Sequence, residues 1–303
     1  DTVSIQAGNY QPIGQLLVDK SLSFVGENDQ MPTINLDSAA LLANWDVTPN
    51  FGTNFTNLKF QSNGSSSDWT FMLRSGNYRF TNCHFYEIQS SYNIRIINSS
   101  LVVEGCEFNN SDSIVDIVTW GENEADNTVH FISNQINQSS LWIELRSSTD
   151  SLYLRNYHFQ QKDVRIEVGY LALSDTYFDN CPVQILVDQG HFENNTFFSC
   201  APASGVNLIR IEDEGEGTFL RNVFNWNNAA YALIRAASTQ LFTIDHCTFA
   251  SNETSLFELQ GDSYGELSNS IVQTNESQNI LFFNGNSSQS FFSKYNLIDF
   301  SAG

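Results

Sequence analysis

Basic residues are scarce in this chain of 303 residues. It contains 13 Lys and Arg against 34 Asp and Glu, and its formal net charge is −21. Such a balance repels phosphate backbones and anionic lipid headgroups, so we expect neither nucleic acid nor a membrane surface as a partner. The composition is that of an acidic protein whose surface could attract cations.

Long apolar runs and helical periodicity are also absent. No run of 18 apolar residues occurs, so the sequence predicts no membrane-spanning helix. Apolar residues do not recur with a 3.6-residue period, which argues against helical repeats. The chain starts at Asp1 with neither a Met nor a signal peptide, as expected of a mature or trimmed product.

What the chain does contain is an internal repeat, best seen in FTNCHF at 80–85. The template places an apolar residue first, a turn-forming residue third, a small residue fourth and a large apolar anchor last. It recurs at intervals of about 24 residues, a period that signals a solenoid. The anchors are Phe60, Phe85, Phe108, Ile136, Phe159, Phe178, Phe197, Phe224, Phe249, Val272 and Ile298.

The columns of this repeat indicate the type of solenoid. Three positions before the anchor, most residues are Asn, Asp, Gly, Ser or His, which tolerate a left-handed bend or bond to the local backbone. Two short strands that meet at a sharp bend, repeated about every 24 residues, describe one turn of a parallel β-helix. A leucine-rich repeat is excluded because the dominant anchor is Phe and no leucine ladder occurs.

We therefore predict an all-β fold, a right-handed parallel β-helix of about 12–13 turns. Residues 1–303 are expected to form a single domain, because no linker or break in composition divides them. Within it, residues 1–50 are expected to form irregular turns and residues 51–303 regular ones. The segment 36–45 is the best candidate for a short helix.

The chain resembles the pectate-lyase-like superfamily of right-handed β-helices. In that superfamily an Asn two residues before a buried anchor stacks on its copy in the next turn, and the amides form an internal ladder. Asn134, Asn195, Asn222 and Asn296 match this position, and the opening stretches VSIQAGNY at 3–10 and LLVDKSLSFVG at 16–26 resemble a first turn of the family. The superfamily hosts enzymes, adhesins and structural proteins, so the resemblance implies a fold and leaves the function open.

Nine Asn-x-Ser/Thr sequons favour a secreted, extracellular glycoprotein located at a cell surface. Five of them follow an anchor by one to three residues, just outside the bend, where a glycan could project into solvent. The candidate glycosylation sites are Asn54, Asn63, Asn98, Asn109, Asn137, Asn194, Asn252, Asn275 and Asn286.

The five cysteines follow the repeat as well. Cys83 and Cys106 occupy the same column in consecutive turns, and Cys181 and Cys200 each lie three residues after consecutive anchors. Stacked residues lie about 4.8 Å apart, within the range of a disulfide, so each pair is a candidate disulfide. The alternative is that these thiols are small buried residues of the ladder. Because no CxxC or Cys/His spacing occurs, zinc is not expected.

The sequence contains no recognisable catalytic constellation, so it favours a protein that is not an enzyme. Motifs of polygalacturonases are absent, and GNYQ at 8–11 only approaches the opening motif of pectin methylesterases. Asp116, Asp175, Asp179 and Asp188 are candidates for a calcium site of pectate-lyase type, but they fall in different columns. No cofactor is expected, apart from a weak calcium candidate in the loop with Glu212, Asp213, Glu214 and Glu216.

Three functions are compatible with these features. The first is an extracellular structural or adhesive glycoprotein, since FENN at 192–195 and FLRN at 219–222 resemble the units of repeat adhesins. Neither end of the solenoid has a cap in the sequence, so either capping segments lie outside this chain or copies associate end to end, as in a filament. The second is a module that binds polysaccharide or cell-surface glycans through aromatic residues such as Trp69, Trp120, Trp142 and Trp226. The third is a divergent lyase or hydrolase acting on acidic polysaccharide.

Overall fold

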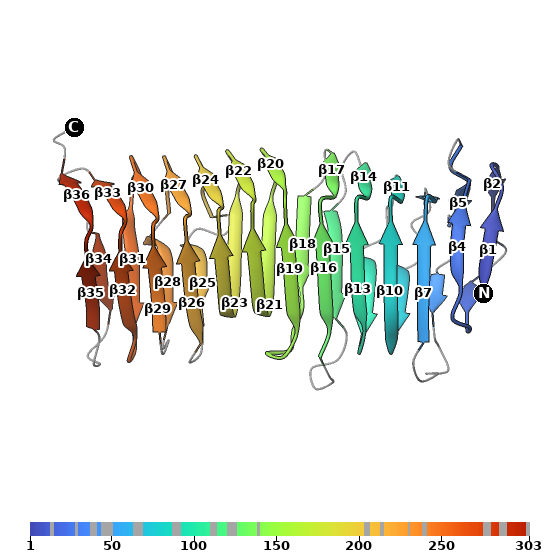
Figure 1. Cartoon of the computed structure of the whole chain (residues 1–303), viewed down its shortest axis with the longest axis horizontal. Helices are drawn as coiled ribbons and strands as arrows, with labels where there is room; N and C mark the ends of the chain where they lie inside the picture. The colour runs from blue at the N-terminus through green and yellow to red at the C-terminus, as the bar shows by residue number, and fades with distance from the viewer. Residues whose placement is uncertain are drawn as a thin grey trace. The chain divides into compact units, whose positions relative to one another are not determined.

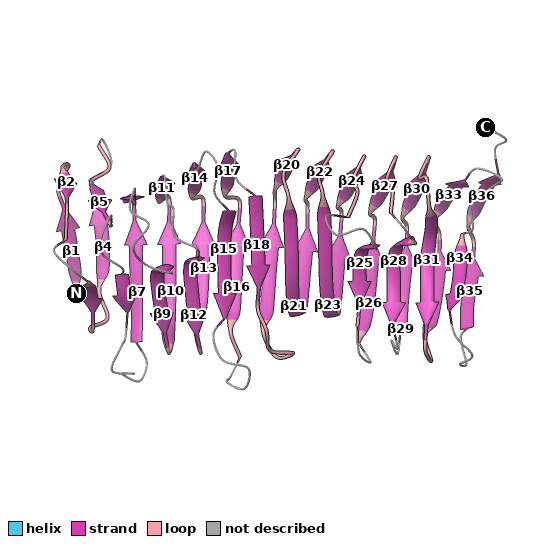
Figure 2. Ribbon diagram, turned by 180° about the vertical axis from the view of Figure 1, so that it is seen from behind, coloured by secondary structure: helices cyan, strands magenta, loops and turns pink. Residues whose placement is uncertain are grey.

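Strands one turn apart in this chain pair in parallel. In the computed structural model the described part of the chain contains 36 strands and no helix (Figures 1 and 2). The stacked parallel sheets form a β-solenoid, which confirms the predicted fold class. The structure describes residues 1–12, 15–27, 30–36, 41–43, 51–62, 69–86, 92–109, 114–119, 126–137, 140–202, 207–212, 215–229, 231–237, 241–274, 280–284 and 290–300.

The contacts of the chain fall into two units, residues 1–153 and 154–303, and each unit is described by itself. The expectation of one domain over 1–303 stays a prediction. Both units have the same construction, in which each turn contributes one short strand to a narrow sheet and longer strands to a wide one.

In the first unit the narrow sheet has six strands in spatial order along the chain. They are β2 (Asn9–Tyr10), β5 (Thr33–Asn35), β8 (Lys59–Gln61), β11 (His84–Tyr86), β14 (Glu107–Asn109) and β17 (Gln135–Asn137). One row of wider strands comprises β1 (Thr2–Ile5), β4 (Ser23–Gly26), β7 (Phe51–Thr56), β10 (Gly76–Thr81), β13 (Ser100–Glu104) and β16 (Thr128–Ile132), while β19 (Ser151–Arg155) contains the unit boundary. The other row comprises β3 (Leu16–Val18), β6 (Leu41–Ala43), β9 (Trp69–Arg74), β12 (Tyr92–Ile97), β15 (Ile114–Thr119) and β18 (Ser140–Glu144).

In the second unit the narrow sheet has seven strands. They are β20 (His158–Gln160), β22 (Tyr177–Asp179), β24 (Thr196–Phe198), β27 (Val223–Asn225), β30 (Thr248–Ala250), β33 (Ile271–Thr274) and β36 (Leu297–Phe300). The wide rows begin with two long strands, β21 (Val164–Ser174) and β23 (Val183–Glu193). They continue in β25 (Asn207–Ile211), β28 (Ala232–Ala237), β31 (Ser255–Gln260) and β34 (Leu281–Asn284), and in β26 (Glu216–Leu220), β29 (Leu241–Asp245), β32 (Tyr264–Ser268) and β35 (Ser290–Lys294).

The narrow sheets contain six described strands in the first unit and seven in the second, and the β-solenoid has about 10 turns against the 12–13 expected. The early turns are more regular than expected, because within residues 1–50 the strands β1 to β6 already pair in parallel register. The expected helix at 36–45 is wrong in its described part. Leu41–Ala43 form the strand β6 and pair with β3 and β9, because all three residues are buried between those strands.

A left-handed residue produces the bend before every anchor. Three positions ahead of each of the eleven anchors, φ lies between 48° and 63°. Most of these residues are the Asn, Asp, Gly, Ser and His that the sequence marked, but two larger residues also adopt the conformation. The residues are Asn57, Asn82, Gly105, Ser133, Asn156, Asp175, Asn194, Arg221, His246, Asn269 and Tyr295.

The anchors form continuous aromatic stacks in the core. In the second unit the Phe178 and Phe197 ring centroids lie 4.7 Å apart, and Phe224 and Phe249 continue the stack at 4.8 and 4.9 Å. In the first unit Phe85 stacks on Phe108 at 4.6 Å. Each buried Phe contributes about 1.5–3 kcal/mol through burial and each ring pair about 0.5–1.5 kcal/mol more, so the columns set the register of the turns.

Beside each stack runs a ladder of side chains that bond to the backbone of the neighbouring turn, here called the first ladder. The Asn222 Oδ1 accepts the Asn195 backbone N–H at 2.9 Å, and its Nδ2 donates to the Phe192 carbonyl at 2.8 Å. Asn134, Asn195 and Asn296 make the same bonds, as the resemblance implied. The other described members of the first ladder are Cys83, Cys106, Cys247 and Ser270, whereas Thr176 in the same column donates to the Ser174 carbonyl of its own turn.

Two further ladders were not anticipated from the sequence. The second ladder, in the second unit, consists of Cys181, Cys200, Asn227 and Asn252, which lie three residues after consecutive anchors. The third ladder, in the first unit, consists of Ser99, Asn127 and Asp150. All members of both ladders are buried and supply partners to backbone groups that would otherwise be orphaned inside the solenoid.

Candidate functional site: the open first turn

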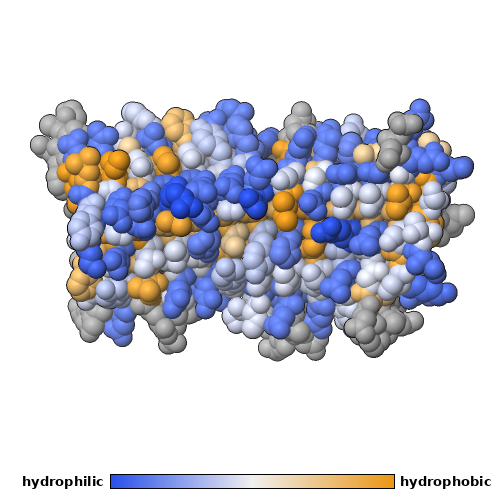
Figure 3. Space-filling model, in the orientation of Figure 1, coloured by the Kyte–Doolittle hydropathy of each residue, from blue (hydrophilic) through white to orange (hydrophobic). Residues whose placement is uncertain are grey.

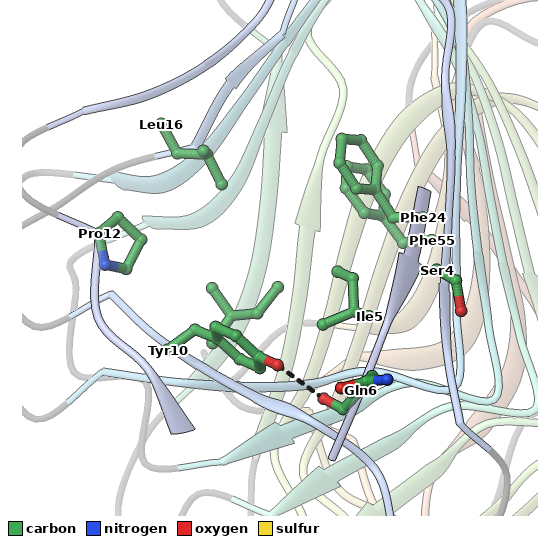
Figure 4. Close-up of a pocket in the computed structure, with 9 residues that line it drawn as sticks. Ser4, Ile5, Gln6, Tyr10, Pro12, Leu16, Phe24 and Phe55 are labelled. Carbon is green, nitrogen blue, oxygen red and sulfur yellow. Dashed lines mark hydrogen bonds between the residues drawn. The ribbon is translucent and has the colours of Figure 1, made fainter. Parts of the chain in front are cut away.

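A cavity of about 480 Å³ opens at the first turn of the first unit (Figure 4). Its walls are mostly apolar. The lining residues come from β1 to β5 and β7 and from the segments that connect them: Ser4, Ile5, Gln6, Tyr10, Pro12, Leu16, Phe24, Ile34 and Phe55. In Figure 4 the rings of Phe24 and Phe55 lie one behind the other, and the Tyr10 hydroxyl donates to the Gln6 carbonyl at 3.0 Å.

The cavity exists because an aromatic stack stops there. Phe80, Phe55 and Phe24 stack with centroid distances of 4.8 and 5.3 Å. The residue paired with Phe24 in β1 is Val3, which is too small to cover the ring and is itself 38 % exposed. Among the residues that the structure describes, none covers the Phe24 side of the core at this turn.

The backbone of the first turn is open as well. Among the described strands, β1 pairs only with β4, and β2 only with β5. A strand paired on one side presents a row of free N–H and C=O groups, which is a template for another strand. The edge of the first turn thus combines hydrogen-bonding groups with an apolar cavity.

The last turn of the second unit has the corresponding features. Among the described strands, β35 pairs only with β32, and β36 only with β33. Phe292, Tyr295 and Leu297 are 49, 87 and 63 % exposed. In Figure 3 hydrophobic atoms gather at the left of the upper band, where Figure 1 draws β33 and β36, and Ile271 and Leu297 are paired and exposed there.

The sequence analysis missed the residues of the first-turn cavity because the repeat period fails near the start of the chain. The step from Ser23 to its partner Asn54 is 31 residues, well above the usual 24, so no anchor was assigned before Phe60. The alternation of Val3 and Ile5 with Thr2 and Ser4 was the available signal.

Of the predicted acidic candidates, Asp116 has the most unusual surroundings. It is 8 % exposed on β15, pairs in register with Trp142 on β18, and no hydrogen bond to it occurs among the described residues. Burial, and to a lesser degree the nearby Glu144 carboxylate, raise the pKa of Asp116 to about 7. Glu144 in turn accepts from Arg146 Nε at 2.8 Å. A carboxyl with a raised pKa beside one held by a guanidinium is an arrangement found in acid–base sites.

The other acidic candidates do not join it. Asp175 bonds to Arg155 and Asn194 at 3.2 Å each, and Asp179 bonds to Gln160 at 3.1 Å, so both belong to surface networks of the second unit. In the acidic loop, Glu212 pairs with Arg210, whereas Asp213 and Glu214 lie outside the described residues. Within the described part of the chain, no three His, Cys, Asp or Glu are grouped to hold a metal ion.

Only two of the four tryptophans named as a possible platform, Trp142 and Trp226, have described side chains. Trp142 lies on β18 in the first unit and is half-buried. Trp226 lies in the second unit and is 57 % exposed. Trp120 lies outside the described residues, as does the side chain of Trp69.

The candidate disulfides are absent from the structure. Cys83, Cys106, Cys181 and Cys200 are buried free thiols, as is Cys247. Their columns were assigned correctly, because Cys83 and Cys106 meet in the first ladder and Cys181 and Cys200 in the second. Each sulfur lies within 3.6 Å of the carbonyl of a residue one turn away, and burial raises the pKa of Cys200 to about 12 and of Cys247 to about 11.

The sequons have contrasting surroundings. Asn54 and Asn194 are exposed, and Asn98 and Asn109 are half-exposed. Asn252 is 1 % exposed, and its amide bonds to Phe224 and Asn227, so its side chain has no room for a glycan in the folded protein. Asn63, Asn275 and Asn286, together with the side chain of Asn137, lie outside the described residues.

Comparisons with known proteins found no matching family model, no similar curated protein and no similar solved structure. In the residues that the structure describes, no helix is long and apolar enough to cross a membrane.

Proposed function

We propose that this chain is a secreted structural or adhesive glycoprotein whose first turn binds the last turn of a second copy. The observation that carries the proposal is the open first turn, where an unpaired strand edge borders a cavity lined by Ile5, Leu16 and Phe24. A parallel β-solenoid suits such an association, because each turn is already built to pair with another turn of the same kind.

The last turn of a second copy is the favoured occupant for two reasons. β35 and β36 are each paired on one side, and so are β1 and β2, so their free edges could pair in parallel. The exposed Phe292 and Leu297 would be partly buried on contact. This contact joins different surfaces on the two copies, so it is heterologous and can propagate into a filament.

The finer parts of the proposal rest on the sequence. Exposed sequons such as Asn54 and Asn194 support secretion and an extracellular, cell-surface location. The β-solenoid fold and the matching Asn ladder support a place among the adhesin-type, non-catalytic members of the pectate-lyase-like superfamily. Cell-surface glycans are then further candidate partners.

The test uses sedimentation velocity over a concentration series, together with electron microscopy of the untagged chain. We expect association that grows with concentration, and loss of it in V3D, which places a charge at the inward edge of β1. T2D is the matched control, since Thr2 lies on the outward face of the same strand. A chain that stays monomeric at every concentration, or a V3D variant that associates like the T2D variant, would refute the proposal.

A second candidate function is favoured by the buried Asp116 and its neighbours Trp142 and Glu144. An aromatic side chain beside two carboxyl groups, of which Asp116 has a raised pKa, suits a polysaccharide ligand, either bound or cleaved. D116N and E144Q are expected to weaken polysaccharide binding while D126N, at an exposed position, leaves it unchanged. Equal binding by all three variants on a glycan array would exclude this function for the site.

A further inference from the structure

A second cavity, of about 340 Å³, lies on the second unit beside the second ladder. It is separate from the first-turn cavity and has no part in the proposed end-to-end contact. Its lining residues are Phe198, Ser199, Cys200, Ala201, Trp226, Asn228 and Glu253.

Trp226 occupies a backbone position that is unfavourable for it. Its φ is 58°, in the left-handed region, where a bulky residue costs about 1–2 kcal/mol. The equivalent positions before the second ladder in neighbouring turns carry small or polar residues: Gln161, Asn180, Ser199 and Ser251. Burial does not offset the cost, because Trp226 is 57 % exposed. An exposed aromatic residue in a strained conformation at the rim of a cavity points to a ligand.

The polar groups of the cavity are mainly hydrogen-bond acceptors. Glu253 is exposed, and Asn228 Nδ2 donates to its Oε2 at 3.0 Å. This bond fixes the carboxylate and leaves its remaining lone pairs available. Backbone bonds hold both residues, since Asn228 N–H donates to the Cys200 carbonyl and Glu253 N–H to the Asn227 carbonyl.

The residues that line the cavity indicate that it attracts cations. No Lys, Arg or His is among the lining residues, and the whole chain has a net charge of −21. Two aromatic residues, Phe198 and Trp226, line the cavity together with Glu253, which forms no ion pair among the described residues. Aromatic faces with a fixed anion attract alkylated ammonium groups, which gain from cation–π contact and lose little hydration.

We propose that this cavity binds an alkylammonium group through Trp226, Phe198 and Glu253. The group could belong to a small quaternary amine or to a trimethylated lysine side chain of a partner protein, because both present a quaternary ammonium cation. A neutral sugar gains less at this site, since it carries no positive charge to pair with the Glu253 carboxylate.

The test is a ¹⁹F NMR titration of the full chain labelled with 5-fluorotryptophan. W226N identifies the Trp226 resonance and also serves as the site variant, because Asn tolerates the left-handed conformation and the variant is expected to fold. Tetramethylammonium and N-acetyl-lysine methylamide in its trimethylated form are the cationic probes, and tert-butanol is the neutral probe of similar shape.

We expect both cations to shift the Trp226 resonance with millimolar affinity and tert-butanol to leave it unchanged. E253Q should weaken cation binding about fivefold, in line with a single exposed cation–π and charge contact. Y231N is the matched control, because Tyr231 is a similarly exposed aromatic residue of the same unit. Tighter binding of the trimethyl-lysine probe than of tetramethylammonium would assign the site to a partner protein, and the reverse to a small amine.

Three outcomes would overturn the proposal. They are an unshifted Trp226 resonance at saturating cation, equal shifts by tert-butanol and tetramethylammonium, and unchanged cation affinity in E253Q. A shift produced by neutral monosaccharides alone would replace the ammonium ligand by a sugar. None of these results depends on the association state of the chain, so failure here leaves the end-to-end proposal untouched.

Discussion

Asparagine, serine and cysteine alternate along the buried ladders because each accepts a backbone N–H and donates to a backbone carbonyl. Asn222 and Cys247 do so on adjacent turns, where the Asn222 N–H reaches the Cys247 sulfur at 3.4 Å. A thiol forms weaker bonds than an amide, but it fills the same small volume. The residue type at a ladder position is therefore less constrained than its capacity to form hydrogen bonds.

This equivalence gives a graded prediction for Asn222. N222A leaves the Asn195 N–H and the Phe192 carbonyl without partners inside the core, and it should destabilise the fold by about 3 kcal/mol. N222C restores weak partners and should lose about half as much. Thermal and urea unfolding measure both, with N228A at an exposed position as the control. Equal losses in N222A and N222C would show that the sulfur does not substitute for the amide.

The adjacent Gln160 and Gln161 provide a matched test of the left-handed bend. Gln161 has a φ of 53°, whereas Gln160 lies in β20. Q161G should therefore raise the free energy of unfolding by up to about 1 kcal/mol, and Q160G should lower it by about as much. The comparison uses urea unfolding of both variants, and a destabilised Q161G would contradict the assignment of strain to this position.

At the scale of the strand and turn, most features of the fold could be predicted from the sequence. The repeat showed the turn-forming residue before each anchor. It also showed the columns of buried Phe and the Asn positions of the first ladder. The second and third ladders were not, because the column of Cys181 and Cys200 changes to Asn at Asn227, and the common role of these residues shows only in the carbonyls they contact. The first-turn cavity was also hidden, since it depends on Val3 being smaller than the Phe it pairs with, and on the long step to Phe55.

On the outward face of β15, Asp116 predicts a pH dependence of stability. Its pKa is about 7 in the folded protein and near 3.8 ordinarily, so between these pH values the folded chain retains a proton that the unfolded chain releases. The contribution of Asp116 to the free energy of unfolding is therefore fully present below about pH 4 and is lost as the pH rises through 7. D116N should be more stable than the parent chain at pH 8, with the difference vanishing near pH 4. Urea midpoints across this range, with D126N as control, measure the effect, and parallel curves for D116N and the parent would refute it.

At the scale of the whole molecule, the structure restricts which sequons can carry glycans. When the chain is expressed through a secretory pathway, peptide mass spectrometry should find glycans at the exposed Asn54 and none at Asn252 in the folded protein. The reason is that a glycan on Asn252 would break its bonds to Phe224 and Asn227 and force the second ladder open. Folded material with a glycosylated Asn252 would contradict the position of that side chain. N54Q, which removes one exposed site, is the control for occupancy.

The free thiols have a consequence for how unfolding can be observed. Five native cysteines sit at different turns, two in the first unit and three in the second, and all are buried. A thiol-reactive reagent can modify each one only when its own turn opens. Because a solenoid opens turn by turn rather than all at once, the five labelling rates would record where fraying begins and how far it travels. The chain thus carries its own set of position-resolved probes, and no residue has to be replaced to use them.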